Sequence, residues 1–134
     1  MNKNLLRFIL GIAVAVAVGE LFFHVVSTGL FGTGFSDKYM TIIWLATAFS
    51  FFLAGFLAAF IAKQREILVS FIAFFILNLF WIYYEVQSLE EVEFHFALIL
   101  IYIVLPALLC MAISLLGGFL AKKLNQLQEK KTEN

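Results

Sequence analysis

Four long stretches with almost no charge constrain this chain more than any other feature. They cover residues 5–26, 40–62, 67–84 and 96–121. A helix needs about 20 mostly apolar residues to cross a hydrocarbon core of roughly 30 Å, and each stretch meets or approaches that length. The stretches are continuously apolar, whereas strands of a transmembrane barrel alternate with a period of two. The sequence therefore predicts an all-α fold, an integral membrane four-helix transmembrane bundle that forms a single domain over residues 1–134.

The composition supports a membrane protein and excludes other classes. Of the 134 residues, 63% are hydrophobic and 13% are charged, and the mean hydropathy is +1.01. Soluble domains are typically near 45–50% apolar and about 25% charged. The formal net charge is zero, which argues against nucleic acid as a partner. We expect the lipid bilayer to be the main environment of the chain.

The basic residues predict the orientation of the bundle. Positively charged residues near membrane spans stay on the cytoplasmic side. Eight of the nine flank the spans on one side: Lys3, Arg7, Lys63, Arg65, Lys122, Lys123, Lys130 and Lys131. Both termini are therefore expected in the cytoplasm, with residues 122–134 as a polar cytoplasmic tail. The compact size and this orientation favour a bacterial inner membrane.

The first stretch also has some features of a cleaved signal peptide. A basic start precedes it, and Ala13, Ala15 and Ala17 are small residues of the kind found at cleavage sites. The apolar run nevertheless continues past these alanines to Val26. We therefore expect the first stretch to remain as a membrane span.

Two segments of the chain resemble each other. Residues 53–58 read LAGFLA and residues 116–121 read LGGFLA, near the same ends of the second and fourth stretches. A duplicated helical hairpin would produce such a match, with its axis along the membrane normal. Chance similarity among common membrane residues is the interpretation we favour, because the first and third stretches share no polar positions.

Small residues predict where the helices pack. Helices in a bilayer associate through close backbone approach, which small side chains permit. The predicted packing positions are Gly11, Ala15, Gly19, Ala54, Gly55, Ala58, Gly117 and Gly118. The third stretch is rich in aromatic residues and has few small ones, so we expect it at the periphery or against another protein. Pro106 is expected to kink the fourth stretch.

Few polar residues interrupt the apolar stretches. Glu20 lies in the first stretch and His24 follows one helical turn later, on the same face. Asn78 and Glu85 share a face of the third stretch. If the two faces meet, these four residues form an intramembrane polar site for a proton, a cation or a polar headgroup. Ionisable groups at such depth are functional candidates, but Glu20 could equally act as interhelical glue.

No catalytic, metal-binding or cofactor-binding site is predicted. The chain has one aspartate, so a paired-aspartate protease is excluded, and two histidines are too few for a multi-histidine metal or haem site. Glu91 and His95 share a helical face in the second outer connection, but they match no defined metal motif. We expect no enzymatic activity.

Two functions remain open. The first is a non-catalytic membrane protein that acts as a homo-oligomer or as an accessory subunit of a membrane complex. It is favoured by the small-residue positions and by the scarcity of buried polar groups. The alternative is a small oligomeric transporter or channel for protons, cations or a small polar solute, with Glu20 and His24 on its path.

Overall fold

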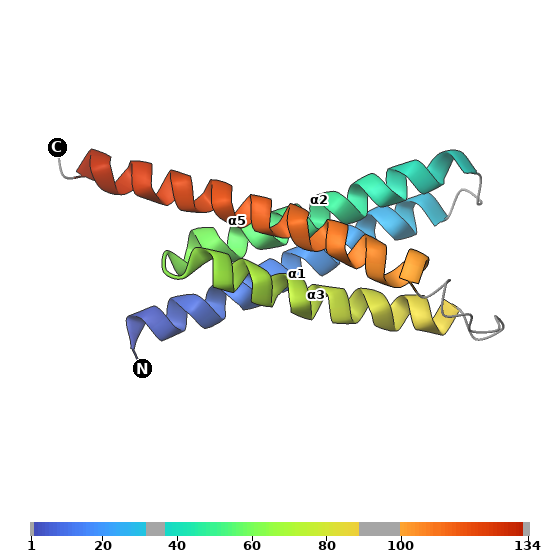
Figure 1. Cartoon of the computed structure of the whole chain (residues 1–134), viewed down its shortest axis with the longest axis horizontal. Helices are drawn as coiled ribbons and strands as arrows, with labels where there is room; N and C mark the ends of the chain where they lie inside the picture. The colour runs from blue at the N-terminus through green and yellow to red at the C-terminus, as the bar shows by residue number, and fades with distance from the viewer. Residues whose placement is uncertain (1, 32–36, 89–99, 133–134) are drawn as a thin grey trace.

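The computed structural model describes residues 2–31, 37–88 and 100–132, and it is all-helical (Figure 1). Helix α1 spans Lys3–Phe31, α2 spans Asp37–Ala62 and α3 spans Glu66–Ser88. A π-helical turn, η1, covers Leu100–Val104 and continues directly into α5, Leu105–Thr132. The predicted set of four long helices is confirmed.

Each long helix contains a stretch that is long and apolar enough to cross a membrane. These stretches are Lys3–Val26, Thr41–Ala62, Glu66–Tyr83 and Leu105–Lys131. Their mean hydropathy lies between 1.8 and 2.3. Four helices of this length and hydropathy are typical of an integral membrane protein.

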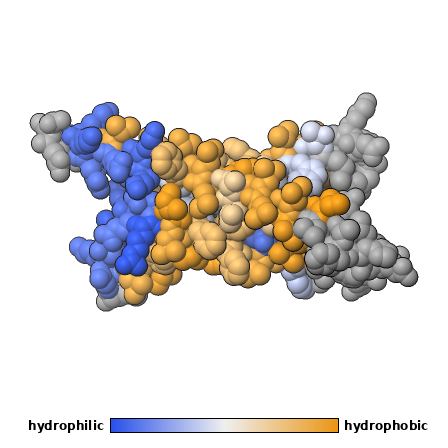
Figure 2. Space-filling model, viewed as in Figure 1, coloured by the Kyte–Doolittle hydropathy of each residue, from blue (hydrophilic) through white to orange (hydrophobic). Residues whose placement is uncertain are grey.

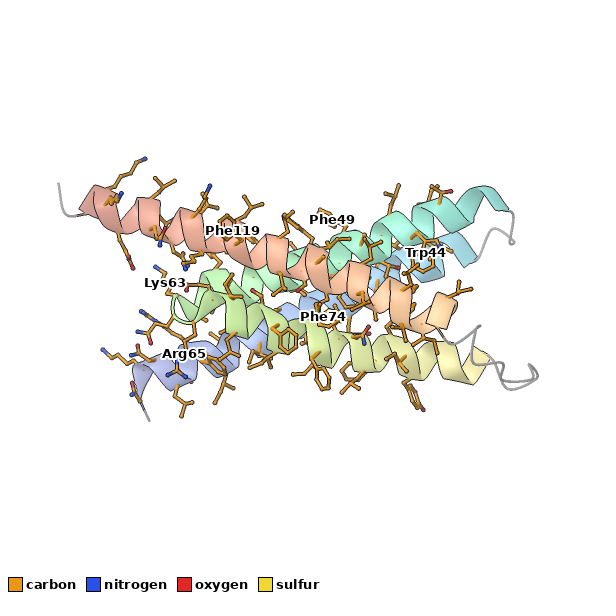
Figure 3. All side chains as sticks on the ribbon, in the orientation of Figure 1. Trp44, Phe49, Lys63, Arg65, Phe74 and Phe119 are labelled. Atoms are coloured by element: carbon orange, nitrogen blue, oxygen red, sulfur yellow. The ribbon has the colours of Figure 1, made fainter. Side chains whose placement is uncertain are left out.

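The helices run alternately up and down, so both termini lie at one end of the bundle (Figure 1). The same end carries the short turn between α2 and α3, where Lys63 and Arg65 are exposed (Figure 3). Hydrophilic residues gather at this end, and an apolar band covers the middle of the molecule (Figure 2). The polar end and the apolar band are thus separated along the helix axes.

Helices α2 and α3 occupy the middle of the bundle. Helix α2 packs against α1, α3 and α5, and α3 also packs against the other three helices. In the parts that the structure describes, α1 and α5 make almost no contact with each other. The buried share of the apolar stretch is 50% for α2 and 39% for α3, against 28% for α5 and 17% for α1. The peripheral position expected for the third stretch is therefore wrong.

Buried residues on one side of α3 explain its central position. Val69, Ser70 and Ala73 are fully buried, and Phe74 packs on Phe51 of α2 with ring centroids 5.7 Å apart. The other side of α3 is exposed, with Phe75 53% accessible. The buried side of α3 thus combines small residues near its start with Phe74, while Phe71, Phe75, Phe80 and Tyr83 are exposed.

Glycines bring α2 into backbone contact with its two closest neighbours. A Cβ atom on Gly55 would collide with the backbone oxygen of Ser114, and one on Gly117 would collide with the backbone oxygen of Phe52. A Cβ atom on Gly11 would lie 2.8 Å from the backbone oxygen of Ala58. Close approach of this kind is the main source of helix association where lipid competes for apolar contacts.

Serine hydroxyls connect three helices at the same level. Ser70 Oγ donates to a carbonyl of its own helix, Glu66 O at 2.8 Å, and shares this bond with Gly55 O of α2 at 2.9 Å. Ser114 Oγ of α5 donates to Ser70 O at 3.3 Å. Helices α5, α3 and α2 are therefore joined by hydrogen bonds that are shielded from water.

The similar segments 53–58 and 116–121 have the same buried positions but different surroundings. The second, third and sixth residues are buried in both. Gly55 packs on Ser114 of α5, whereas Gly118 packs on Ser70 of α3. A two-fold axis between the hairpins would require α1 to contact α5 as α3 contacts α2, and the described helices lack that contact. The bundle is therefore not symmetric about such an axis.

The fourth helical region is irregular close to Pro106. The proline follows the π-helical turn η1 by two residues inside a continuous helical stretch, so the irregular turn lies where the proline removes a backbone N–H. The polar tail, residues 122–134, is helical as far as Thr132. Asn125 within it is only 3% exposed, and its Nδ2 donates to Ala59 O of α2 at 3.4 Å. Asn125 therefore packs against the bundle, while residues 126–131 are exposed.

Candidate functional site

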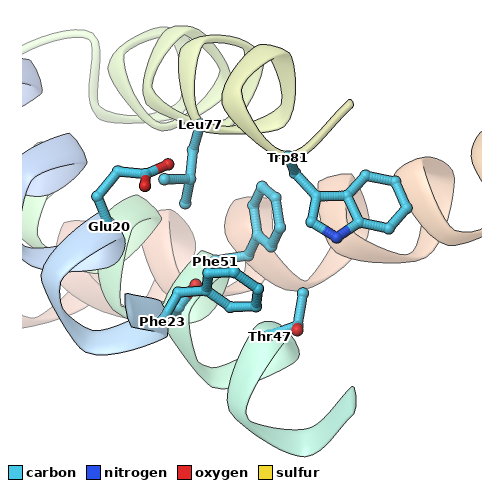
Figure 4. A pocket seen from close by; sticks show the side chains of 7 residues that line it. Glu20, Phe23, Thr47, Phe51, Leu77 and Trp81 are labelled. Carbon is cyan, nitrogen blue, oxygen red and sulfur yellow. The ribbon is translucent and has the colours of Figure 1, made fainter. Parts of the chain in front are cut away.

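A small pocket lies between α1, α2 and α3, and Glu20 is part of its wall (Figure 4). It encloses about 10 Å³, room for about one water molecule. Helix α1 contributes Glu20 and Phe23, α2 contributes three residues, and α3 contributes two. The complete lining is Glu20, Phe23, Thr47, Ser50, Phe51, Leu77 and Trp81.

The pocket lies within the apolar part of the bundle, away from the end that carries the termini. Glu20 and Thr47 are each six residues from the far ends of their apolar stretches, Val26 and Thr41. A rise of 1.5 Å per residue places them about 9 Å inside those ends. A carboxylate at this depth is costly unless it faces a partner or a wet cavity. Glu20 forms part of the wall of this small pocket.

Glu20 reaches the pocket because of the small residue that precedes it. Gly19 is buried, and a Cβ atom there would lie 3.1 Å from Leu77 Cδ2 and 3.5 Å from Ala54 Cβ. The absence of a side chain lets α1 lie close to α2 and α3 at this level. Glu20, the next residue, is half-buried and extends toward α3 in Figure 4.

The other three residues of the predicted polar site do not line this pocket. His24 is exposed on α1, one turn beyond Glu20. Asn78 follows Leu77 and is rotated about 100° from it around the helix axis. It is 8% exposed, and its Oδ1 has no hydrogen-bond partner among the described residues. The side chain of Glu85 lies outside the described residues, as do those of Glu91 and His95. The four predicted residues are therefore not shown to form one cluster.

Of the seven lining residues, only Glu20 was predicted as a site residue, and six were not. Among those six, Thr47 and Ser50 are buried on α2, and Trp81 faces the pocket from α3. Thr47 Oγ1 donates to Ile43 O at 2.8 Å, an ordinary intrahelical bond for a buried hydroxyl. Trp81 follows Leu77 by four residues, the spacing at which side chains share a helical face. The spacing alone did not indicate that this face meets Glu20.

The chemistry available at the pocket is that of a carboxylate among aromatic rings and hydroxyls. Within the described residues, no group of three or more His, Cys, Asp or Glu side chains could hold a metal ion. Cys110, the single cysteine, is buried in α5 and is not part of the lining. The lining itself combines one carboxylate with two hydroxyl groups and three aromatic rings.

The comparisons with known proteins give no relative for this chain. No protein-family model matches it, and no curated protein and no solved structure shows significant similarity to it. The function of the chain is therefore inferred from its sequence and from the geometry described above.

Proposed function

We propose that the chain is an integral membrane protein that acts as a non-catalytic subunit of a membrane assembly. The assembly consists of copies of this chain or of this chain with another membrane protein. All four long helices cross the bilayer in this proposal, which rests on their length and hydropathy.

The orientation follows from the charges at one end of the bundle. Basic residues before α1, between α2 and α3, and in the last turns of α5 gather where both termini lie. Such residues are retained on the cytoplasmic side of a membrane. We therefore place both termini in the cytoplasm, and a bacterial inner membrane fits this arrangement.

The observation that carries the subunit proposal is the closed interior of the bundle. Gly55 and Ser114 lie in contact, and so do Gly117 and Phe52, so that the backbones of α2 and α5 meet directly. Buried hydrogen bonds of Ser70 join α3 to both of them. A single bundle of this kind has little space for a substrate chamber. Its outer surface, in contrast, presents large apolar side chains on every helix. In this proposal the bundle acts through contacts that this surface makes with other subunits.

Cysteine crosslinking in the native membrane tests the homo-oligomer. One strongly exposed position on each helix is replaced by cysteine in a Cys110→Ala background: Leu21, Leu45, Phe75 and Leu109, which are 64%, 65%, 53% and 61% exposed. A closed symmetric interface uses the same patch on both subunits. We expect one helix face, or two neighbouring faces, to give disulfide-linked dimers, while the other positions stay monomeric and serve as matched controls.

An assembly with a different protein has its own readout. Membranes are extracted into polymer-bounded native discs, and copies of the chain and of any second protein are counted in each disc. A reproducible second protein at fixed stoichiometry supports the accessory-subunit form. No crosslinking at any of the four positions, together with discs that hold one unaccompanied copy, would overturn the proposal in both forms.

A second candidate function, transport of protons, cations or a small polar solute, is favoured by one observation. Glu20 places a carboxylate at a pocket inside the apolar band. If transport occurs, Glu20→Gln abolishes flux into proteoliposomes, while Glu66→Gln, at the first turn of α3, leaves it unchanged. If Glu20 is structural, no flux depends on it, and Glu20→Gln changes stability by about 0.6 kcal/mol, a typical value for a membrane hydrogen bond.

A further inference from the structure

We propose that four basic side chains around the turn between α2 and α3 bind a phosphate group at the polar end of the bundle. They are Arg7 of α1, Lys63 and Arg65 of the turn, and Lys122 of α5, and together they are called the basic cluster. Binding at this cluster rests on the membrane insertion in the proposed function, but not on the assembly or on the orientation.

Helix α1 brings Arg7 to the turn. A Cβ atom on Gly11 would lie 3.4 Å from the backbone nitrogen of Ala62, the last residue of α2. Arg7 precedes Gly11 by four residues, so it lies near the same face of α1, one turn or about 6 Å closer to the polar end. The exposed side chain of Arg7 therefore stands at the level of the residues that follow Ala62.

Helix α5 brings Lys122 to the same level. A Cβ atom on Gly118 would lie 3.7 Å from the backbone oxygen of Glu66, the first residue of α3. Lys122 follows Gly118 by four residues, so it lies near the same face of α5 and one turn closer to the polar end. Its half-buried side chain is thus placed against the turn from a second helix.

The backbone of the turn holds its two basic residues in fixed positions. Lys63 and Arg65 are exposed, and their φ angles are 54° and 49° (Figure 3). Lys63 N donates to Ala59 O at 3.1 Å, and Arg65 O accepts from Val69 N at 3.0 Å, so the turn is secured at both ends. Left-handed backbone is unfavourable for most residues with a Cβ atom, and glycine or asparagine usually occupies it. Two basic residues kept there at an energetic cost indicate a role for their charges.

The charge around the turn selects an anion. Glu66 is the only acidic residue among 1–19, 38–84 and 100–128. Arginine binds phosphate through paired N–H donors, and lysine binds it as a point charge. Retention of a loop in the cytoplasm requires only that positive charge flank the spans, and it does not explain why charges from two helices meet at one turn.

The bilayer surface supplies a suitable anion. The apolar stretch of α2 ends at Ala62 and that of α3 begins at Glu66, so the turn lies where the lipid headgroups begin. Basic side chains between helices at this depth bind anionic headgroups. The phosphate can come from an anionic phospholipid or from free inorganic phosphate, and the experiment separates these sources.

Native mass spectrometry of the purified protein in detergent measures the binding. Phosphatidylglycerol and phosphatidylcholine both carry phosphate, but the choline group neutralises the second lipid. We expect the first phosphatidylglycerol molecule to bind at least about tenfold more tightly than phosphatidylcholine. Equal affinities for the two lipids, without binding of inorganic phosphate, would overturn the proposal. Flotation with liposomes after an alkaline wash tests membrane insertion separately.

Asparagine variants of the turn remove charge and keep the backbone. Asparagine tolerates left-handed backbone, so the double variant Lys63→Asn, Arg65→Asn should fold. Each charge removed should weaken phosphatidylglycerol binding about fivefold, and the pair about twenty-fivefold. The matched control, Lys130→Asn with Lys131→Asn, removes two exposed charges from the last turn of α5 and should change the affinity by less than about fivefold. Equal weakening in the two double variants would show a general attraction to the polar end and refute the cluster.

Variants on the helices decide the matter if the turn variant does not fold. Arg7→Gln and Lys122→Gln leave the turn unchanged, and each should weaken binding about fivefold. Glu66→Gln removes the acidic neighbour of the cluster and should strengthen binding. Unchanged binding in all three variants, with folding confirmed by circular dichroism, would contradict the site.

Competition identifies the source of the phosphate. Sodium phosphate is added to the complex with phosphatidylglycerol, and sodium chloride at the same ionic strength is the control. Displacement by phosphate alone means that free phosphate also enters the cluster, whereas no displacement by either salt means that the phosphate must belong to a lipid. Both results support the site. Equal displacement by chloride and phosphate would show screening without a phosphate site and would count against it.

Discussion

Replacing Gly55 by alanine should lower the free energy of unfolding by about 3 kcal/mol, near the upper end of the usual cost of overpacking. The added Cβ would collide with the backbone oxygen of Ser114 and lie 2.6 Å from its hydroxyl oxygen. A backbone oxygen cannot move aside unless α5 itself moves away from α2. The loss should be clear in a titration of the purified protein with sodium dodecyl sulfate, followed by circular dichroism.

Gly19→Ala is the matched control for this experiment. Its Cβ would lie 3.1 Å from Leu77 Cδ2, the end of a flexible side chain, and 3.5 Å from Ala54 Cβ. Alanine also stabilises a helix by about 1 kcal/mol relative to glycine. We expect Gly19→Ala to stay within about 1 kcal/mol of the wild type. Equal stability of the two alanine variants would show that the α2–α5 contact is not as tight as described.

The second large effect is a loss that a compensating change partly offsets. In Gly118→Ala the added Cβ would collide with Ser70 Oγ and lie 2.7 Å from Ser70 Cβ. We expect this variant to lose about 2 kcal/mol of unfolding free energy, within the range for overpacking. Ser70→Gly removes both atoms, so the loss in the double variant should be smaller than the sum of the two single losses by about 1 kcal/mol, the usual coupling between contacting sites.

The control for this coupling combines Ser70→Gly with Gly117→Ala. The Cβ added at position 117 would collide with the backbone oxygen of Phe52, which Ser70 does not touch. Ser70→Gly alone is destabilising, because it removes the hydrogen bond to Gly55 O and places a glycine inside a helix. The losses from Ser70→Gly and Gly117→Ala should therefore add. Coupling of Ser70→Gly with both alanine variants, or with neither, would argue against a specific contact between Gly118 and Ser70.

The four long helices could be predicted from the sequence because hydropathy depends on each residue and its close neighbours alone. Their arrangement could not, because it depends on which faces meet. Ser70 is the clearest example. Its position inside an aromatic helix gave no sign that it would donate to Gly55 of α2 and accept from Ser114 of α5. The interpretation of α3 as peripheral was wrong for this reason.

Among the polar residues, too, only those that stand out from their sequence neighbours could be recognised, whereas positions that depend on helix packing could not. Glu20 stood out because it interrupts an apolar stretch, and it lies at a pocket. Trp81 is one of many aromatic residues in the third stretch, and its place in the pocket wall follows only from the packing of α3 against α1 and α2. Asn125 was assigned to a polar tail because its neighbours are polar, yet it is buried against Ala59.

The buried position of Asn125 has a mechanical consequence. Helix α5 is one continuous helix from Leu105 to Thr132, and Asn125 fixes it against α2 beyond the contacts of Gly117 and Gly118. The residues after Asn125 therefore form a stiff arm and not a tether. A protein that pulls or twists this arm acts on the helix that reaches the serine and glycine contacts in the middle of the bundle. A force applied at the polar end of α5 would therefore be transmitted along the continuous helix to the core of the bundle.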